Sequence, residues 1–529
     1  MPTFQRSKNG APPMNDRIRR FALAALAVTS ATALLAGCAG GDASGSEAQD
    51  RSLRIVLATE PVSLDPCDTQ DAANAQILRA NVLESLTRID AQTGEVVPLL
   101  AEEWEASDDN KTWTFTLKEG VTFHDGAVFD AEAAATAVNR VLNTDIGCGN
   151  GTTDQFPYPV TTTVIDENTL QLTSEQPDGI FPLRMTYIDL ASPNTPTDAK
   201  TDDPIGTGPF ELGEVVSGES ITLTPFADYW GEAPEATEVT YLYRTEPTVR
   251  ASMITTGEAD LAVPISAADA TDDGLTKEYS DNRVFFLRTQ TNKPPFNDPR
   301  VREAVHYAID RETIVGALME RSGLPYDQLV APTVNAYLEG YEGPGFDPDK
   351  ATELLDEAAA DGVAVDTTIE LVTRPDLFPG SDEVMQSIAQ NLTDVGFSVQ
   401  LRSLDTDAWL QLLRKPFPPE QVPNIIAISH DNISGDASFT FPKYVASTGT
   451  NSTLENSEID ALIAEAETKS GDERAELYQE ASKLLYDEEF TLVPIALQTK
   501  LLRLAPGIDY EPNGLTGVEL RISDITFTG

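Results

Sequence analysis

His124 and Asp125 are the adjacent residues of this 529-residue sequence that come nearest to catalytic chemistry. A histidine beside a carboxylate can act as a general base, because its pKa lies near neutral pH. No serine or cysteine nucleophile has a recognisable setting near His124, and the sequence lacks the Gly-x-Ser-x-Gly, His-Glu-x-x-His and Walker-type motifs. We therefore expect His124 to hold a turn by a hydrogen bond, and His306 to be packed or exposed within a helix.

Metal and cofactor chemistry find little support in the sequence. The three histidines and three cysteines lie far apart, which argues against a zinc ribbon or an iron–sulfur cluster. A nickel chelate would find one or two histidine ligands at most. Because Asp and Glu number 86, acidic pairs carry no information about glycosidase-type catalysis. We expect no resident metal ion and no cofactor.

The charge balance excludes one class of partner. The formal net charge is −50, whereas a nucleic-acid-binding surface needs a basic footprint, so no nucleic acid is expected. The acidity could reflect a strongly hydrated surface, or adaptation to high salt, which screens the repulsion between carboxylates. Both interpretations stay open. With 40% hydrophobic and 7% aromatic residues, the chain should form two or three globular domains.

The N-terminus is predicted to be a targeting segment. Arg17, Arg19 and Arg20 precede an uncharged stretch, 21–36, which runs into Leu35-Ala36-Gly37-Cys38. A basic region, an apolar region and small residues before a cleavage site are typical of a secretory signal, and the last four residues resemble the bacterial lipobox. We expect residues 1–37 to be removed and Cys38 to carry lipid. The alternative is a weak transmembrane helix.

A lipid on Cys38 would leave the mature chain outside the cytoplasmic membrane but anchored to it. Residues 38–50 are small and polar, as in a flexible tether. Thiols outside the cytoplasm are not kept reduced, so Cys67 and Cys148 could form a disulfide, which the sequence leaves open.

Strands and helices alternate through the rest of the chain, which predicts an α/β fold. Asp130, Asp298 and Asp347 each stand where they can cap a helix, and the last two precede a proline. Asp71 is expected to begin a helix that continues to Leu86. Strands are predicted at 53–58, 112–117, 169–172, 220–223, 368–372, 398–402 and 424–428.

A series of short motifs follows in a fixed order along the chain. The motifs are Pro98–Trp104, Trp113–Gly126, Ile205–Phe210, Tyr229–Gly231, Gly257–Asp260, Pro294–Arg302, Ala308–Arg311 and Phe346–Ala351. In this order, and behind a lipobox, they resemble family 5 of the ABC-transporter solute-binding proteins, the peptide/nickel class. The resemblance covers about residues 53–500.

This resemblance implies a two-lobe fold of the periplasmic-binding-protein type (class II) with an additional inserted domain. Lobe I is expected at 51–97, 200–285 and 489–529, the inserted domain II at 98–199, and lobe III at 286–488. The two lobes would be joined by hinge strands and would close over a ligand held between them.

The resemblance also indicates where the ligand would lie. In peptide-binding members a strand is followed by a Gly-Trp pair and an aspartate that binds the α-amino group of the peptide. Here the strand 424–428 is followed by Ser429-His430, and the acid is displaced to Asp431 or Asp436. We expect His430 and Asp431 to contact the ligand, and Asp431 to bind a cation or hydroxyl groups. The alternative is a surface turn.

Four further residues are candidates for the ligand site. Glu60 lies in a segment that borders the cleft in the family, and we expect it to make a polar contact. Trp409 and Phe439 from lobe III and Tyr187 from domain II are aromatic candidates, although each could equally be part of a core.

The expected function is therefore that of a membrane-tethered, monomeric receptor that delivers a small solute, a peptide or similar molecule, to the permease subunits of an ABC importer. The chain is not expected to be an enzyme. Two alternatives remain at this point: a sensor or chaperone-like binder that works without transport, and an extracellular hydrolase that uses carboxylates or His124.

Overall fold

The computed structural model describes residues 51–528, apart from Gln70, Gln92, 151–154, Asp272, Asp376, Pro379 and 433–434. The predicted signal segment 1–37, the lipid attachment at Cys38 and the tether 38–50 lie outside the described residues. No helix in the described part of the chain is both long enough and apolar enough to cross a membrane.

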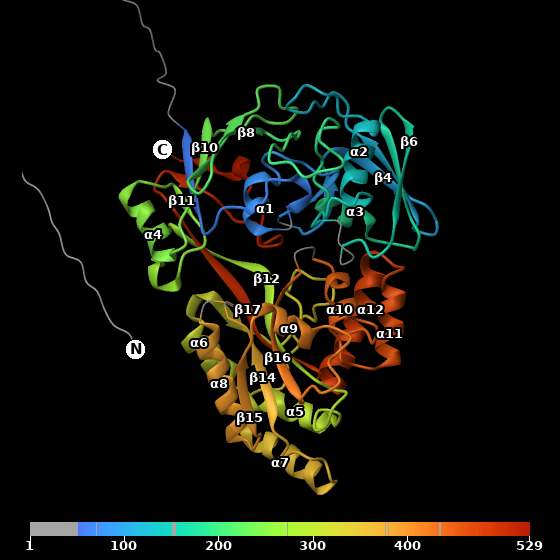
Figure 1. Ribbon diagram of the computed structural model, residues 1–529, viewed down its shortest axis with the longest axis vertical. Helices are drawn as coiled ribbons and strands as arrows, with labels where there is room; N and C mark the ends of the chain where they lie inside the picture. The colour runs from blue at the N-terminus through green and yellow to red at the C-terminus, as the bar shows by residue number, and fades with distance from the viewer. Residues whose placement is uncertain are drawn as a thin grey trace, which may run out of the picture. The chain divides into compact units, whose positions relative to one another are not determined.

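One mixed sheet of eleven strands, counted over the described residues, organises the fold (Figure 1). β14 runs parallel to β15 and β16, and β1 runs parallel to β10 and β11. β13 (Gly323–Pro325) pairs with β17 beside the main path. The order is β15 (Val399–Ser403), β14 (Ile369–Thr373), β16 (Asn424–Asp431), β12 (Thr276–Thr289), β17 (Leu492–Leu504), β11 (Leu261–Ala262), β1 (Ser52–Leu57), β10 (Glu238–Tyr243), β9 (Ser220–Pro225) and β8 (Phe210–Val216).

β12 and β17 join two halves of this sheet, which we call the β1 half (β1 and β8–β11) and the β14 half (β14–β16). β12 pairs with β16, β17 pairs with β11, and the two long strands pair with each other. Their ladder is irregular between Ser280 and Val284, and Asn282 has a φ of 57°. Asparagine tolerates this left-handed conformation, and a bulge bends the strand that carries it. The two halves are therefore joined through an irregular pairing.

A second, antiparallel sheet is formed by β4 (Ala101–Ala106), β5 (Thr112–Leu117), β7 (Thr169–Ser174) and β6 (Val160–Asp166). Strict alternation directs Trp113, Phe115 and Leu117 into one core, where α2 (Ala131–Leu142) packs on them. We call this sheet and its helix the small domain. The hydrophobic cores on the β14 half contain other residues, so the small domain has a core of its own.

Two hydrophobic cores cover the two faces of the β14 half. Ile425 and Ala427 of β16 point into one core, and Ile426 and Ile428 point into the other, as the two-residue period of a strand requires. The helices that cover this half are α5 (Pro299–Ala308), α6 (Arg311–Leu318), α7 (Pro348–Ala360), α8 (Ser381–Asp394), α9 (Thr406–Leu413), α10 (Phe441–Tyr444), α11 (Ser457–Ala466) and α12 (Gly471–Leu484).

The helix caps predicted at Asp130, Asp298 and Asp347 are confirmed. Asp130 accepts a hydrogen bond from the backbone N–H of Ala133 at the start of α2. Asp298 and Asp347 cap α5 and α7 in the same way, each with a proline in the first turn. These contacts are local, so the residue types alone suffice to predict them.

The helix predicted between Asp71 and Leu86 is too long, because α1 spans only Ala72–Leu78. Arg79 is extended and Ala80 has a φ of 61°. The Arg79 side chain lies buried against Asp189, with 3.2 Å between Nε and Oδ2, and Asn81 donates to the carbonyl of Leu520 at 2.8 Å. These long-range contacts outweigh the local preference for a helix.

Candidate ligand-binding site

The carboxyl edge of the β14 half gathers several of the candidate residues. Because β14, β15 and β16 are parallel, their carboxyl ends lie on the same edge. Val372 is level with Ile426, so Arg374, directly after β14, lies near the end of β16, whose last two residues are His430 and Asp431. Ligands of open α/β sheets bind beyond the carboxyl ends of the strands. This edge is therefore the candidate ligand-binding site.

Arg374 has the most distinctive chemistry at this edge. Its guanidinium carbon lies 5.1 Å from the centre of the Trp409 ring. Its Nε is buried and has no hydrogen-bond partner among the described residues. A buried donor without an acceptor is unfavourable, and a guanidinium binds a carboxylate through two parallel hydrogen bonds. Arg374 was missed from the sequence, although an Arg-Pro pair directly after an apolar strand was a usable signal.

Trp409 packs against the guanidinium of Arg374. It lies in α9, is buried within one of the two cores of the β14 half, and donates from Nε1 to the carbonyl of Ala427 at 3.2 Å. This hydrogen bond fixes the indole to β16, and the guanidinium of Arg374 lies over the face of the indole ring. Its predicted contact with a ligand stays a prediction.

His430 and Asp431 form the last two positions of β16. Asp431 Oδ2 lies 2.7 Å from the guanidinium of Arg283 on β12, beside the bulge. Burial disfavours ionisation of Asp431, but Arg283, His430 and Lys500 outweigh burial and lower the pKa of its carboxyl. His430 Nε2 lies 3.0 Å from Thr440 Oγ1. A ligand cation at Asp431 would therefore share the carboxylate with Arg283.

The structure brings Tyr187 and Phe439 together, although 252 positions separate them in the sequence. Tyr187 follows the small domain in the chain, on what we call the small-domain side, and Phe439 belongs to the β14 half. Their ring centres lie 5.5 Å apart. Arg79 stacks on Tyr187 and Arg184 stacks on Phe439, each with its guanidinium carbon 5.5 Å from the ring centre. Tyr187 is buried and Phe439 is half-buried, so the pair forms a contact between the two sides.

Among the described contacts, Glu60 touches none of the other five predicted ligand-site residues and instead binds the backbone of Gly218. Both of its carboxylate oxygens accept from the backbone N–H of Gly218, at 3.0 Å, in the turn between β8 and β9. Its predicted polar contact with a ligand stays a prediction.

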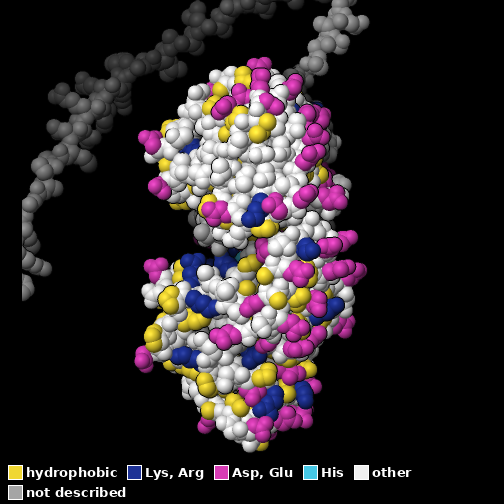
Figure 2. Space-filling view, turned by 90° about the vertical axis from the view of Figure 1, so that its right-hand side faces the viewer, with side chains coloured by type: hydrophobic (Ala, Val, Ile, Leu, Met, Phe, Trp, Pro, Cys, Tyr) yellow, Lys and Arg dark blue, Asp and Glu magenta, His cyan; other side chains and the backbone are white. Residues whose placement is uncertain are grey.

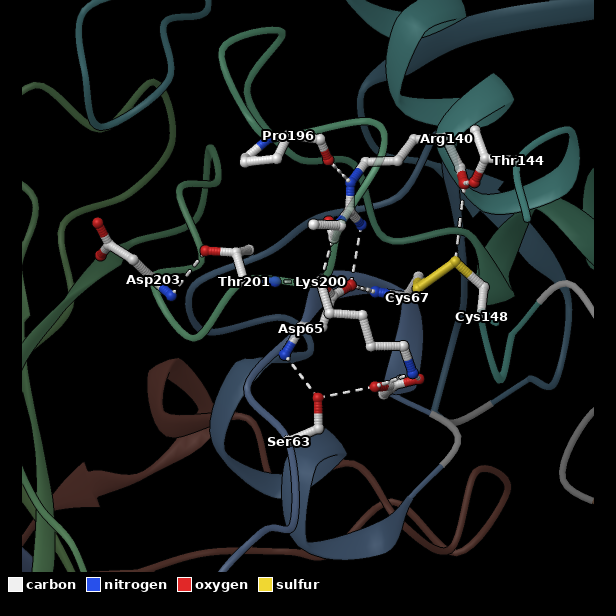
Figure 3. Close-up of polar contacts among 12 residues, drawn as sticks. Ser63, Asp65, Cys67, Arg140, Thr144, Cys148, Pro196, Lys200, Thr201 and Asp203 are labelled. Atoms are coloured by element: carbon white, nitrogen blue, oxygen red, sulfur yellow. Dashed lines mark hydrogen bonds and ion pairs between the residues drawn. A yellow bond between two sulfur atoms is a disulfide. The ribbon is translucent and has the colours of Figure 1, made fainter. Parts of the chain in front are cut away.

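The segment that follows Glu60 is firmly anchored (Figure 3). Asp65 and Arg140 form a buried ion pair at 2.7 Å, and the backbone N–H groups of Cys67 and Thr201 also donate to Asp65. Burial disfavours ionisation of Asp65, but these donors outweigh it and lower its pKa. Cys67 and Cys148 are joined by a disulfide, with Cα atoms 5.0 Å apart, so covalent and ionic links hold the same segment.

His124 and His306 occupy structural positions. Both ring nitrogens of His124 face the Gly206–Gly208 segment, with Nε2 3.0 Å from the carbonyl of Gly208, and burial lowers its pKa. Burial, together with the nearby Arg311, lowers the pKa of His306 to about 3. No group of three or more metal-ligating side chains occurs within the described ranges.

Glu84 joins two of the sequence motifs, Ile205–Phe210 and Tyr229–Gly231, and was missed from the sequence. Its carboxylate accepts from Thr207, Tyr229 and Trp230, at 2.8, 2.9 and 2.8 Å. Burial raises the pKa of Glu84 to about 7, although these donors oppose the shift. The Gly-Thr-Gly-Pro and Tyr-Trp-Gly motifs therefore have a structural basis in one buried carboxyl group.

The acidic residues lie mainly on the surface. Figure 2 shows Asp and Glu side chains spread over the visible face from end to end, whereas Lys and Arg gather mainly on its lower half. A strongly charged surface keeps a protein hydrated and soluble.

Comparison with known proteins places this geometry in a family. Residues 95–450 match the model described as "Bacterial extracellular solute-binding proteins, family 5 Middle". The chain therefore belongs to family 5 of the bacterial extracellular solute-binding proteins, and the predicted family is confirmed. Proteins of this family bind small ligands outside the cytoplasm for ABC importers, and they are not enzymes.

Individual relatives support the same fold. The chain is 28% identical over 453 residues to the glutathione-binding protein GsiB of Salmonella paratyphi A, which covers 82% of this chain and 86% of that protein. HbpA2 from Haemophilus parasuis has a TM-score of 0.79 at 22% identity, over 90% of this chain and 99% of that one. NikA from Brucella suis in complex with Fe(III)-EDTA has a TM-score of 0.76 at 24% identity, over 90% and 100%. The predicted α/β fold is confirmed.

Proposed function

We propose that this protein is a lipid-tethered, monomeric receptor that binds a short, carboxylate-bearing peptide and delivers it to an ABC importer. The observation that carries the ligand class is Arg374, whose buried Nε finds no acceptor in the described part of the chain and whose guanidinium lies over the Trp409 ring. A ligand carboxylate would satisfy that donor. Glutathione, the ligand named for the relative GsiB, is a peptide with free carboxylates and is the first compound to test.

The amino end of such a peptide would lie toward Asp431. This carboxylate stays ionised near neutral pH, because the positive charges around it lower its pKa. Asp431 is the last residue of β16, at the same edge at which Arg374 follows β14. The carboxylate of a zwitterionic peptide would thus face Arg374, and its ammonium group would face Asp431.

The ligand would be enclosed by movement of the β14 half relative to the β1 half and the small domain. In this proposal lobe I would contain the β1 half, domain II (98–199) the small domain and lobe III (286–488) the β14 half. Contacts that a ligand makes only in the closed form would drive closure. The lipid on Cys38 would keep the receptor near the permease, which raises its effective concentration there.

Calorimetric titration of the mature chain with glutathione, a dipeptide and the C-terminal amide of that dipeptide tests this proposal. We expect binding of at least one acid and much weaker binding of the amide. Arg374→Gln should weaken binding of the acid by about 2 kcal/mol, or about 30-fold, since it removes a charged hydrogen-bond donor.

Arg402→Gln is the matched control. Arg402 lies on the neighbouring strand β15 and pairs with Glu370 at 2.6 Å, so its loss should leave binding unchanged. If both variants bind the acid as the wild type does, or if acid and amide bind equally, Arg374 is not the carboxylate anchor.

A further inference from the structure

The contact between the small-domain side and the β14 half extends well beyond Tyr187 and Phe439. Asn110 Nδ2 lies 3.4 Å from the carbonyl of Thr468, and Arg184 lies 3.8 Å from Glu467. Gly179, in the loop before α3 (Phe181–Arg184), approaches the backbone between α11 and α12 closely. We call these residues the closing contact: Asn110, Gly179, Arg184 and Tyr187 on one side, Phe439 and Glu467–Ser470 on the other.

Gly179 makes the tightest approach. A Cβ atom placed on Gly179 would lie 2.1 Å from the carbonyl oxygen of Lys469 and 2.6 Å from its carbonyl carbon. Both are backbone atoms, which cannot rotate out of the way as a flexible side chain could. The φ of Gly179 lies outside the left-handed region, so alanine would meet no strain there when the two sides are apart.

On each side of the closing contact, the buried arginine pairs with an aspartate of the same side. Arg184 lies 2.6 Å from Asp178 on its own side. Arg474, on the opposite side, lies 2.8 Å from Asp436 and donates to it through two nitrogens. The pairs that cross the contact are longer, at 3.8 Å for Arg184 and Glu467. The two sides can therefore separate without leaving a buried charge unpaired.

No strand of the described residues pairs the small domain with the main sheet, and the core of the small domain shares no residue with the cores of the β14 half. The pairing that joins the β14 half to the β1 half runs through β12 and β17 and contains the bulge at Ser280–Val284. A rotation at this point would open the closing contact and leave every hydrophobic core intact.

We propose that the closing contact forms only in the closed state, and that Gly179 sets ligand affinity by permitting closure without touching the ligand. This inference rests on the proposed receptor function. Because the open state lacks the contact, changes in it should alter the open–closed equilibrium and leave the fold unaffected.

The first test compares Gly179→Ala with Gly345→Ala, at an exposed glycine whose Cβ would meet no atom within 4 Å. We expect Gly179→Ala to bind the peptide probes at least about tenfold more weakly than wild type, with an unchanged thermal midpoint in the absence of probe. Gly345→Ala should match wild type in both measurements. Wild-type affinity in Gly179→Ala, or a lowered midpoint without probe, would overturn the inference, since the latter indicates a permanent interface.

The second test needs no ligand. In the double variant Asn110→Cys/Thr468→Cys, the side chain of residue 110 faces the backbone of residue 468 when the closing contact forms, so a short thiol-specific crosslinker can span the two cysteines. We expect the crosslinker to join the two cysteines, and to do so about tenfold more slowly when Gly179→Ala is added. Equal rates in the two backgrounds would overturn the inference.

The outcomes separate the two proposals. If Arg374→Gln abolishes binding while Gly179→Ala binds normally, the receptor function stands and the closing contact fails. If no peptide probe binds the wild type but crosslinking slows in Gly179→Ala, the closing contact stands and the proposed ligand class fails.

Discussion

The pairing at the β12 bulge and the closing contact both connect the β14 half to the rest of the protein, but they are built differently. At the bulge, a continuous backbone ladder runs on both sides of an irregular segment, and Asp281 lies between Lys500, at 3.0 Å, and Arg283, at 3.7 Å. At the closing contact, side chains and one backbone approach meet without any ladder.

This difference indicates which contacts can break. Charges at the bulge are neutralised across the joint between β12 and β17, so we expect this joint to persist when the protein opens and closes. Charges at the closing contact are neutralised within each side, so that contact can come and go. Substitutions near the bulge should therefore change global stability, whereas substitutions across the closing contact should change ligand affinity.

Asp436→Asn should have the largest effect on stability, because it removes the carboxylate that neutralises the buried Arg474 on one side of the closing contact. Arg474 would stay buried without its carboxylate, which should lower the free energy of unfolding by about 3–5 kcal/mol in urea denaturation. Asp260→Asn is the control: its partner Arg54 is partly exposed, so the loss should stay within about 1 kcal/mol. A loss of unfolding free energy below about 1 kcal/mol in Asp436→Asn would contradict the claim that Asp436 neutralises Arg474 within its own side of the contact.

The same aspartate predicts an acid limit. Burial disfavours its ionisation, but Arg474 outweighs burial and lowers the pKa of Asp436 to about 2. A lowered pKa contributes stability above the ordinary value of 3.8, and that stability is lost as the pH falls through about 2. Asp436→Asn should therefore lose less stability than wild type between pH 4 and pH 2.

Glu84→Gln should have the next largest effect, and it provides a reference outside both regions. The pKa of Glu84 is raised from 4.5 to about 7, so its contribution is full below pH 4.5 and is lost as the pH rises through about 7. Wild type should lose about 3 kcal/mol from this group over that window, and Glu84→Gln should not. Parallel pH profiles of the two proteins in urea would contradict the assignment.

Asp281→Asn tests the joint at the bulge. Asp281 is buried, but Lys500 and Arg283 are partly exposed and can be hydrated when it is lost. We expect the free energy of unfolding to fall by about 1–3 kcal/mol, equally with and without ligand. A change in ligand affinity at unchanged stability would mean that the bulge behaves like the closing contact.

Glu467→Gln should have the smallest effect and the opposite signature. It removes the charge that lies 3.8 Å from Arg184 across the closing contact and 3.6 Å from Arg474 on its own side. Arg474 keeps its shorter pair with Asp436, and the hydroxyl of Tyr478 keeps an acceptor. Affinity for the peptide should fall about threefold, while stability without ligand stays within about 0.5 kcal/mol. Stability loss without affinity loss would place Glu467 in a permanent interface.

Local features of this fold were predictable from the sequence, and long-range ones were not. The caps at Asp130, Asp298 and Asp347 depend on residues within three positions, and all three are confirmed. The helix after Asp71 was overestimated, because Arg79 finds Asp189 more than one hundred residues away.

The candidate site shows the same limit. His430 and Asp431 could be placed at the end of a strand by pattern, but the ion pair with Arg283 needs the register of β12 against β16. The proximity of Tyr187 and Phe439 needs the packing of two separate cores. Arg374 is marked mainly by its buried Nε, which has no partner among the described residues, and this appears only in the structure; in the sequence its one signal is the Arg-Pro pair after an apolar strand.

The position of β17 in the sheet also constrains how the chain can assemble during export. β17 is the last long strand of the sequence, yet it lies between β12 and β11 in the middle of the main sheet. A chain that emerges N-terminus first can pair β12 with β16 and β11 with β1, but these two groups stay unconnected until β17 arrives. A premature stop before Leu492 would therefore yield two separate sheets with open edges, and such a product should aggregate or be degraded.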